Sequence, residues 1–148
     1  MEIDGIEQAI EGFKSLGQGT QWAVLSQATA AGAREVAKQA KQNAPTGKEA
    51  HYAYNGQFVA PGYAKSTVKA VRFRKKYQGV ALVAVGPNLI GYYLTQFVER
   101  GHATRSGGFI PADPWLKPAL DNKENDVLKA FVKKMDTAID KAIKKGNL

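Results

Sequence analysis

Strands are clearest in Lys65-Ser-Thr-Val-Lys-Ala-Val-Arg-Phe-Arg-Lys75 and in Val80-Ala-Leu-Val-Ala-Val85. The first segment carries β-branched and aromatic residues between basic ones. The second is an apolar run short enough for a strand buried on both faces. Residues 76–79 alone separate the two segments, so the strands are expected to pair antiparallel. The middle of the chain therefore predicts a small antiparallel sheet.

Two helices are expected before this sheet. Apolar residues recur every three or four positions within residues 3–16 and again within 22–40, which is the period of an amphipathic helix. Gly17-Gln-Gly19 is expected to end the first helix, and Asn43-Ala-Pro45 the second. The small residues 28–33 would let the longer helix pack close to a neighbouring one.

Further helices are expected after the sheet. Tyr93, Leu94, Phe97 and Val98 form one stripe of a helix over residues 91–100, with Gly101 as its cap. Asp113-Pro114 is typical of a helix start, and apolar residues within 128–143 define a closing amphipathic helix. The fold class predicted is α+β: an antiparallel sheet with a β-hairpin insertion, packed against a long N-terminal helix and a C-terminal helix.

The insertion, which we call the tongue, comprises residues 48–62. Two short β-prone runs, His51-Tyr-Ala-Tyr54 and Gln57-Phe-Val-Ala60, flank Asn55-Gly56, the dipeptide that best accepts a positive φ at both positions of a tight turn. This pattern predicts a β-hairpin. A long aromatic insertion in a compact domain is often functional, although a structural hairpin fits the pattern as well.

Composition places the chain among single globular domains, so one domain over residues 1–148 is expected, with 44% hydrophobic and 23% charged side chains. The absence of cysteine excludes thiol catalysis, zinc ribbons and disulfide scaffolds, and two histidines argue against a His-rich metal site. The longest uncharged segment, 77–98, is interrupted by Gly86-Pro-Asn88, which favours a turn over a membrane span. The sequence predicts a soluble protein without cofactor or metal.

The formal net charge is +8, from 21 basic and 13 acidic residues. A basic cluster attracts nucleic acid or an acidic protein surface, and it equally suits a strand edge protected from aggregation. The excess lies mainly in the basic cluster Lys65, Lys69, Arg72, Arg74, Lys75 and Lys76.

The best candidates for acid–base chemistry are Glu99, His102 and Asp113, which flank one Gly-rich loop, 101–112. Each also fits a structural role: a glutamate at a helix end, a solvated loop histidine and an aspartate at a helix N-cap. These structural roles account for all three residues, so no catalytic residue is assigned and the chain is not expected to be an enzyme.

Several segments, taken in order, form a family pattern. The segments are the helix end Ala44-Pro-Thr-Gly47, Tyr63-Ala-Lys-Ser-Thr-Val68, Val83-Ala-Val-Gly-Pro-Asn88, Tyr93 with Phe97-Val-Glu-Arg-Gly101, and Ile110-Pro-Ala-Asp-Pro-Trp-Leu-Lys-Pro-Ala119. Their order and spacing resemble the small tail-completion or neck proteins of long-tailed bacteriophages. The tongue is a departure from that pattern, because the family usually has a short link there.

The resemblance implies a structural virion protein of the neck, present in the host cytoplasm during assembly. It would form a homo-oligomeric ring, expected to be six-fold, at the head-proximal end of the tail. Its partners would be neighbouring neck and tail proteins and, non-specifically, the passing genomic DNA. The residues assigned to interfaces on this basis are Tyr52, Tyr54, Asn55, Gly56, Phe58, Glu99, Arg100 and Trp115. A basic nucleic-acid-binding module is the alternative, and a small hydrolase using Glu99 and His102 is a third.

Overall fold

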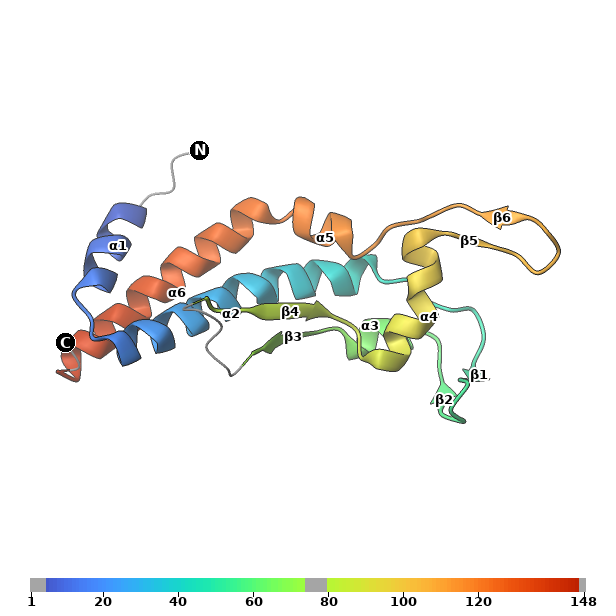
Figure 1. The fold of residues 1–148 in the computed structure, drawn as a ribbon, viewed down its shortest axis with the longest axis horizontal. Coiled ribbons are helices and arrows are strands. Elements are labelled where there is room, and N and C mark those ends of the chain that lie inside the picture. The colour runs from blue at the N-terminus through green and yellow to red at the C-terminus, as the bar shows by residue number, and fades with distance from the viewer. Residues whose placement is uncertain (1–4, 74–79, 147–148) are drawn as a thin grey trace. The chain divides into compact units, whose positions relative to one another are not determined.

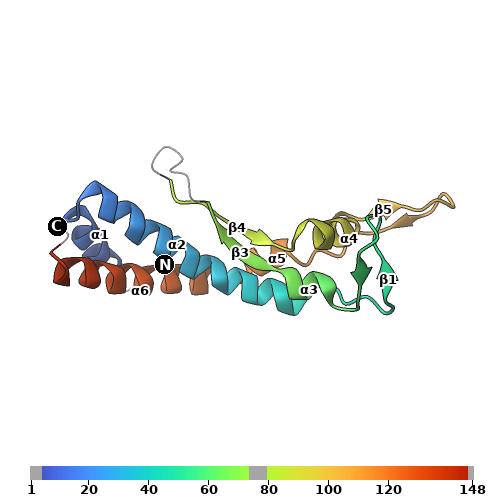
Figure 2. The ribbon, with the colours of Figure 1, turned by 90° about the horizontal axis from the view of Figure 1, so that it is seen from below.

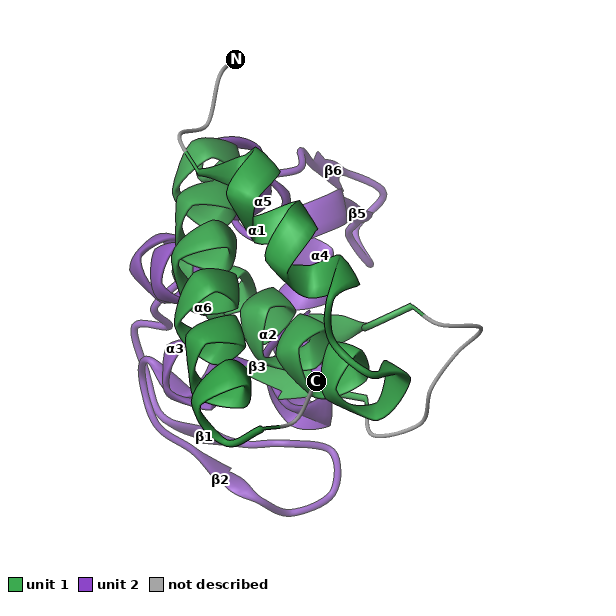
Figure 3. Ribbon diagram, turned by 90° about the vertical axis from the view of Figure 1, so that its left-hand side faces the viewer, with its two compact units in different colours: residues 1–35, 70–84, 123–148 green, residues 36–69, 85–122 purple. Residues whose placement is uncertain are grey.

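In the part of the chain that the structure describes, helices dominate and three short two-stranded sheets join them, so the predicted α+β class is confirmed (Figure 1). The computed structural model describes residues 5–73 and 80–146. Contacts divide the chain into two compact units: residues 1–35, 70–84 and 123–148 form unit 1, and residues 36–69 and 85–122 form unit 2 (Figure 3). Both units are assembled from separated segments, and the single domain expected from the sequence stays a prediction.

Unit 1 has a helical core. The helices α1 (Ile6–Lys14) and α6 (Glu124–Lys144) lie side by side, and the N-terminal part of α2 (Gln18–Asn43) completes the cluster (Figures 1 and 2). The buried members of the core are Ala9, Leu16, Val24, Ala28, Val132, Met135, Ala138, Ile139 and Ala142. The expected N-terminal and C-terminal helices are confirmed, except that α2 already begins at Gln18, inside the segment expected to separate α1 from α2.

The close approach expected at residues 28–33 is confirmed at Gly32. A Cβ atom on Gly32 would lie 2.9 Å from Cγ1 and 3.0 Å from the carbonyl oxygen of Val127 in α6. Such distances are shorter than real side chains tolerate, so only glycine lets α2 and α6 come this close here.

The central strands are shorter and more exposed than their sequence predicts. The strands β3 (Lys69–Arg72) and β4 (Val83–Gly86) pair and run in opposite directions (Figure 1). The Phe73 N–H donates to the Leu82 carbonyl at 3.0 Å. Burial on both faces is wrong for the segment 80–85, because its residues alternate: Val80 and Leu82 are 52% and 43% exposed, whereas Val83 and Val85 are partly buried.

Unit 2 contains a helix where a strand was expected. Residues 65–67 belong to α3 (Tyr63–Thr67), which begins after Gly62 with its φ of 79°. The hydroxyls of Ser66 and Thr67 donate to the carbonyls of Tyr63 and Ala64, at 2.8 and 3.1 Å. These local hydrogen bonds favour a helical turn over a strand.

The tongue is confirmed as a hairpin. The strands β1 (His51–Tyr52) and β2 (Phe58–Val59) pair antiparallel, with His51 opposite Val59 and Tyr52 opposite Phe58. The Gly56 N–H donates to the Ala53 carbonyl at 2.9 Å, and Gly56 has a φ of 80°. The loop is therefore a three-residue one with the left-handed residue at Gly56 rather than a two-residue turn.

The Gly-rich loop contains a second hairpin, of strands β5 (His102–Ala103) and β6 (Phe109–Ile110), which sequence reasoning missed. It follows α4 (Leu89–Arg100) and precedes the short helix α5 (Lys117–Asp121). Asp113 therefore does not cap a helix, and that prediction is wrong. The Asp113 N–H instead donates to the Val98 carbonyl at 2.8 Å.

Candidate functional site

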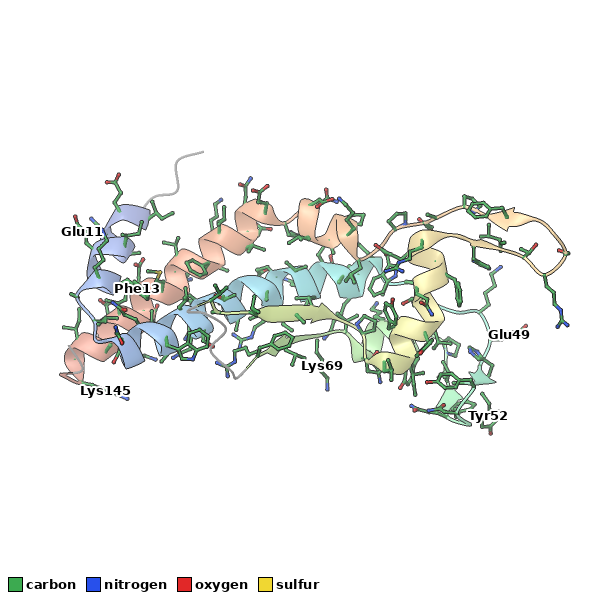
Figure 4. The ribbon with its side chains drawn as sticks, viewed as in Figure 1. Glu11, Phe13, Glu49, Tyr52, Lys69 and Lys145 are labelled. Carbon is green, nitrogen blue, oxygen red and sulfur yellow. The ribbon has the colours of Figure 1, made fainter. Side chains whose placement is uncertain are left out.

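The aromatic side chains of the tongue are exposed. Tyr52 and Tyr54 are each 73% exposed and Phe58 is 56% exposed, and Figure 4 shows Tyr52 at the tongue. The rings of Tyr52 and Phe58 meet edge to face with centroids 5.6 Å apart. The pairing follows from the hairpin register, which places these two residues opposite each other. The tongue thus holds its aromatics in a defined arrangement and presents them to the outside.

A hydrogen bond joins Gln57, beside the turn of the tongue, to α3, and a second joins α3 to the start of α4. The Tyr63 hydroxyl lies 2.7 Å from Nε2 of Gln57 and 3.0 Å from Nδ2 of Asn88, and accepts from both. Asn88 in turn caps α4, because its side-chain oxygen accepts from the Gly91 N–H at 2.8 Å. A hollow of about 350 Å³ beside these residues is lined by the loop 45–51, β2, α3 and α4.

The helix α4 turns its aromatic side outward. Gly91 and Thr95 are its buried residues, whereas Tyr93 is 45% and Phe97 52% exposed. The expected stripe is divided, because Tyr93 and Phe97 are exposed whereas Leu94 and Val98 are partly buried and line the hollow. On the buried side of α4, a Cβ at Gly91 would lie 2.8 Å from the Thr67 hydroxyl, so glycine lets α3 pack there.

Glu99 and Trp115 hold unit 2 together. The Glu99 carboxylate accepts the backbone N–H groups of residues 115, 116 and 117 at 2.8, 3.0 and 3.1 Å. Burial raises the pKa of Glu99, but the three N–H donors outweigh it and hold that pKa below its ordinary value. Trp115 is 4% exposed, and its carbonyl accepts from Nδ2 of Asn43 at 3.1 Å. The side chain of Trp115 is therefore buried within the chain and the carboxylate of Glu99 is bound within it, while their assignment to an interface stays a prediction.

The remaining predicted site residues lie on the outside. Asn55, Gly56 and Arg100 are exposed. In the basic cluster, Lys65 and Lys69 are exposed in unit 2 and Arg72 in unit 1. The other three members of the basic cluster, Arg74, Lys75 and Lys76, lie outside the described residues.

The three acid–base candidates lie in different local environments. Glu99 is bound to backbone, Asp113 is exposed, and His102 stacks against Phe97 with centroids 5.3 Å apart. Within residues 5–73 and 80–146, no three His, Asp or Glu side chains gather as a metal site. The candidate site that the geometry supports is the exposed aromatic surface of unit 2.

Among the described helices, none has the length and apolar character needed to cross a membrane. No protein-family model, no curated protein and no solved structure matches the chain.

Proposed function

We propose that this chain is a structural virion protein of the phage neck, which assembles as a ring at the head-proximal end of the tail and joins the tail to the head connector. The observation that carries the proposal is the tongue, whose three aromatic side chains are 56–73% exposed. Aromatic residues are enriched at the centres of protein–protein interfaces, and exposed apolar patches mark interaction sites.

The anchoring of the tongue supports the same role. A hairpin of two-residue strands is marginal alone in water, and here Gln57, beside its turn, bonds Tyr63 of α3, which in turn accepts from Asn88 at the start of α4. An aromatic hairpin held in this way suits docking, because fewer conformations are lost when the partner binds.

The mass of the protein in solution tests this proposal. Light scattering of the wild-type protein, alone and with neighbouring neck proteins, should give a ring-sized oligomer that electron microscopy resolves as closed. The Tyr52→Ala, Phe58→Ala double variant should still fold, but it should assemble poorly. Phe73→Ala is the matched control, since Phe73 is an aromatic of unit 1 that is 54% exposed, and it should assemble normally. A wild-type protein that stays monomeric in every mixture would contradict the proposal.

The alternative, a basic nucleic-acid-binding module, draws support from the exposed side chains of Lys65, Lys69 and Arg72. Binding through such residues would be independent of sequence. The logarithm of affinity should then fall with the logarithm of salt concentration by about 0.9 for each phosphate contacted. Titration of fluorescent duplexes of unrelated sequence at several salt concentrations would separate this function from assembly, because assembly needs no nucleic acid.

A further inference from the structure

The outward face of α4 is a second aromatic surface, and the tongue of the same chain meets it at Tyr93, whose ring lies edge to face with that of Tyr54 at a centroid distance of 5.3 Å. Its exposed members recur at helical spacing along one side of α4, opposite the buried Gly91 and Thr95. They are Leu89, Tyr92, Tyr93 and Phe97, with Arg100 as the one charged residue of that face. A surface helix normally turns such residues to the core. In α4 these four apolar residues nevertheless stay 42–66% exposed.

This face continues into the second hairpin. Phe97 stacks on His102 of β5, and the paired strand β6 carries Phe109 and Ile110, which are 68% and 47% exposed. We call the exposed residues of α4 and β6 together the α4–β6 surface. The hairpin β5–β6, like the tongue, has only two paired residues in each strand, and a hairpin of that length is marginally stable unless another surface packs against it.

The aromatic side chains of the α4–β6 surface and those of the tongue expose similar areas. Taking about 200 Å² for a whole aromatic side chain, Tyr52, Tyr54 and Phe58 leave about 400 Å² exposed. Tyr92, Tyr93, Phe97 and Phe109 also leave about 400 Å². Interfaces are a little over half apolar, so an apolar patch of that size corresponds to about 700 Å² per partner, close to the roughly 800 Å² of a stable complex.

The charges of the two surfaces are compatible as well. Residues 52–58 of the tongue contain no ionisable group other than tyrosine, and the outward face of α4 contains only Arg100. Two charge-poor aromatic surfaces can meet without like-charge repulsion and without burying unpaired ions. Nucleic acid would instead need several cations in the contact.

We propose that the α4–β6 surface binds the tongue of a second copy of this chain. This inference rests on the proposed ring, and it names the two surfaces through which neighbours in the ring meet. A contact between two different surfaces of identical subunits is heterologous, and such contacts close into rings when the rotation allows. Each subunit then gives its tongue to one neighbour and receives the tongue of the other.

The first experiment compares two variants by light scattering over a range of concentrations, with circular dichroism as the check on folding. Phe97→Ser with Phe109→Ser should weaken self-association by about tenfold or more, because aromatic anchors dominate interface energies. Phe73→Ser, which removes an equally exposed aromatic of unit 1, should assemble like the wild type. If the wild type forms rings and the double variant forms them equally well, this inference is overturned while the proposed function stands.

The second experiment does not depend on how well the double variant folds. The chain has no cysteine, so single cysteines introduced as Phe58→Cys and Phe97→Cys can be placed on separate chains and mixed. Oxidation should join a Phe58→Cys chain to a Phe97→Cys chain in preference to either like pair. Cross-linking of like chains only would show a symmetric contact and overturn the inference. Failure of the wild type to self-associate at any concentration would overturn both this contact and the ring.

Discussion

Replacing Glu99 by glutamine tests whether this residue is a structural clamp. The carboxylate accepts three backbone N–H groups from residues 115–117, and the amide of glutamine would turn an NH₂ group toward one of these donors. Hydrogen bonds to a charged acceptor contribute about 1.5–3 kcal/mol each, and the site is only partly buried, so Glu99→Gln should cost about 2 kcal/mol. For a chain of this size the melting temperature should fall by about 4–8 °C.

The matched control is Asp113→Asn, which removes the same charge from an exposed side chain of the same unit. It should change the melting temperature little, because exposed charges contribute little to stability. Both variants are measured by thermal and urea unfolding at pH 7, followed by circular dichroism. Equal stability of the two variants would refute the clamp.

The pH dependence of the same pair gives an independent check. The folded pKa of Glu99 lies below its ordinary value, so the carboxylate binds fewer protons in the folded than in the unfolded chain. Its stabilisation is therefore complete above the unfolded pKa and is lost as the pH falls through the folded pKa. The difference between wild type and Glu99→Gln should be largest near neutral pH and should shrink below the ordinary pKa of glutamate. A difference that stays constant into acid would mean that the charge is not responsible.

Three further predictions follow from the backbone and from the tongue. Gly32→Ala should destabilise by about 1–3 kcal/mol because its Cβ meets Val127, whereas Gly19→Ala in the same helix meets nothing within 4 Å and should be neutral or stabilising. Gly101→Ala should cost more than Gly107→Ala in urea unfolding: both have positive φ, but only at Gly101 would the Cβ lie within 2.8 Å of backbone atoms. Amide exchange over residues 52–58 should be slower in the assembled ring than in the monomer, and unchanged exchange would place the tongue outside the interface.

Sequence reasoning succeeded where the signal is local and repeated. The tongue carries Asn55-Gly56 between two β-prone runs, and α6 keeps its apolar period over most of its 21 residues. Both elements therefore form as predicted. The hairpin β5–β6 was missed because strands of two residues are too short to display alternation, although Ser106-Gly107-Gly108 is a turn signal that could have located it.

The start of α5 illustrates a different limit. Asp113-Pro114 has the composition of a helix start, yet the orphan N–H groups before α5 are satisfied by Glu99, a residue 16 positions before Trp115. Capping preferences consider only residues next to the helix start in the sequence, so they cannot predict a hydrogen-bond acceptor that belongs to another helix. The same bond explains why Trp115 is buried, since Glu99 holds its backbone against the end of α4.

The helix α4, whose aromatic side chains face outward, shows why the candidate site could be predicted only in part. Periodicity identifies an apolar stripe but does not tell whether the chain itself or another molecule covers it. In α4 the covered side is set by Gly91 and Thr95, because small residues let α3 approach, and the bulky aromatics are left on the opposite side. When a helix has an apolar stripe on one side and small residues on the other, either side can pack against the rest of the chain. Only the packing of α3 against α4 selects the orientation in which Tyr93 and Phe97 face outward.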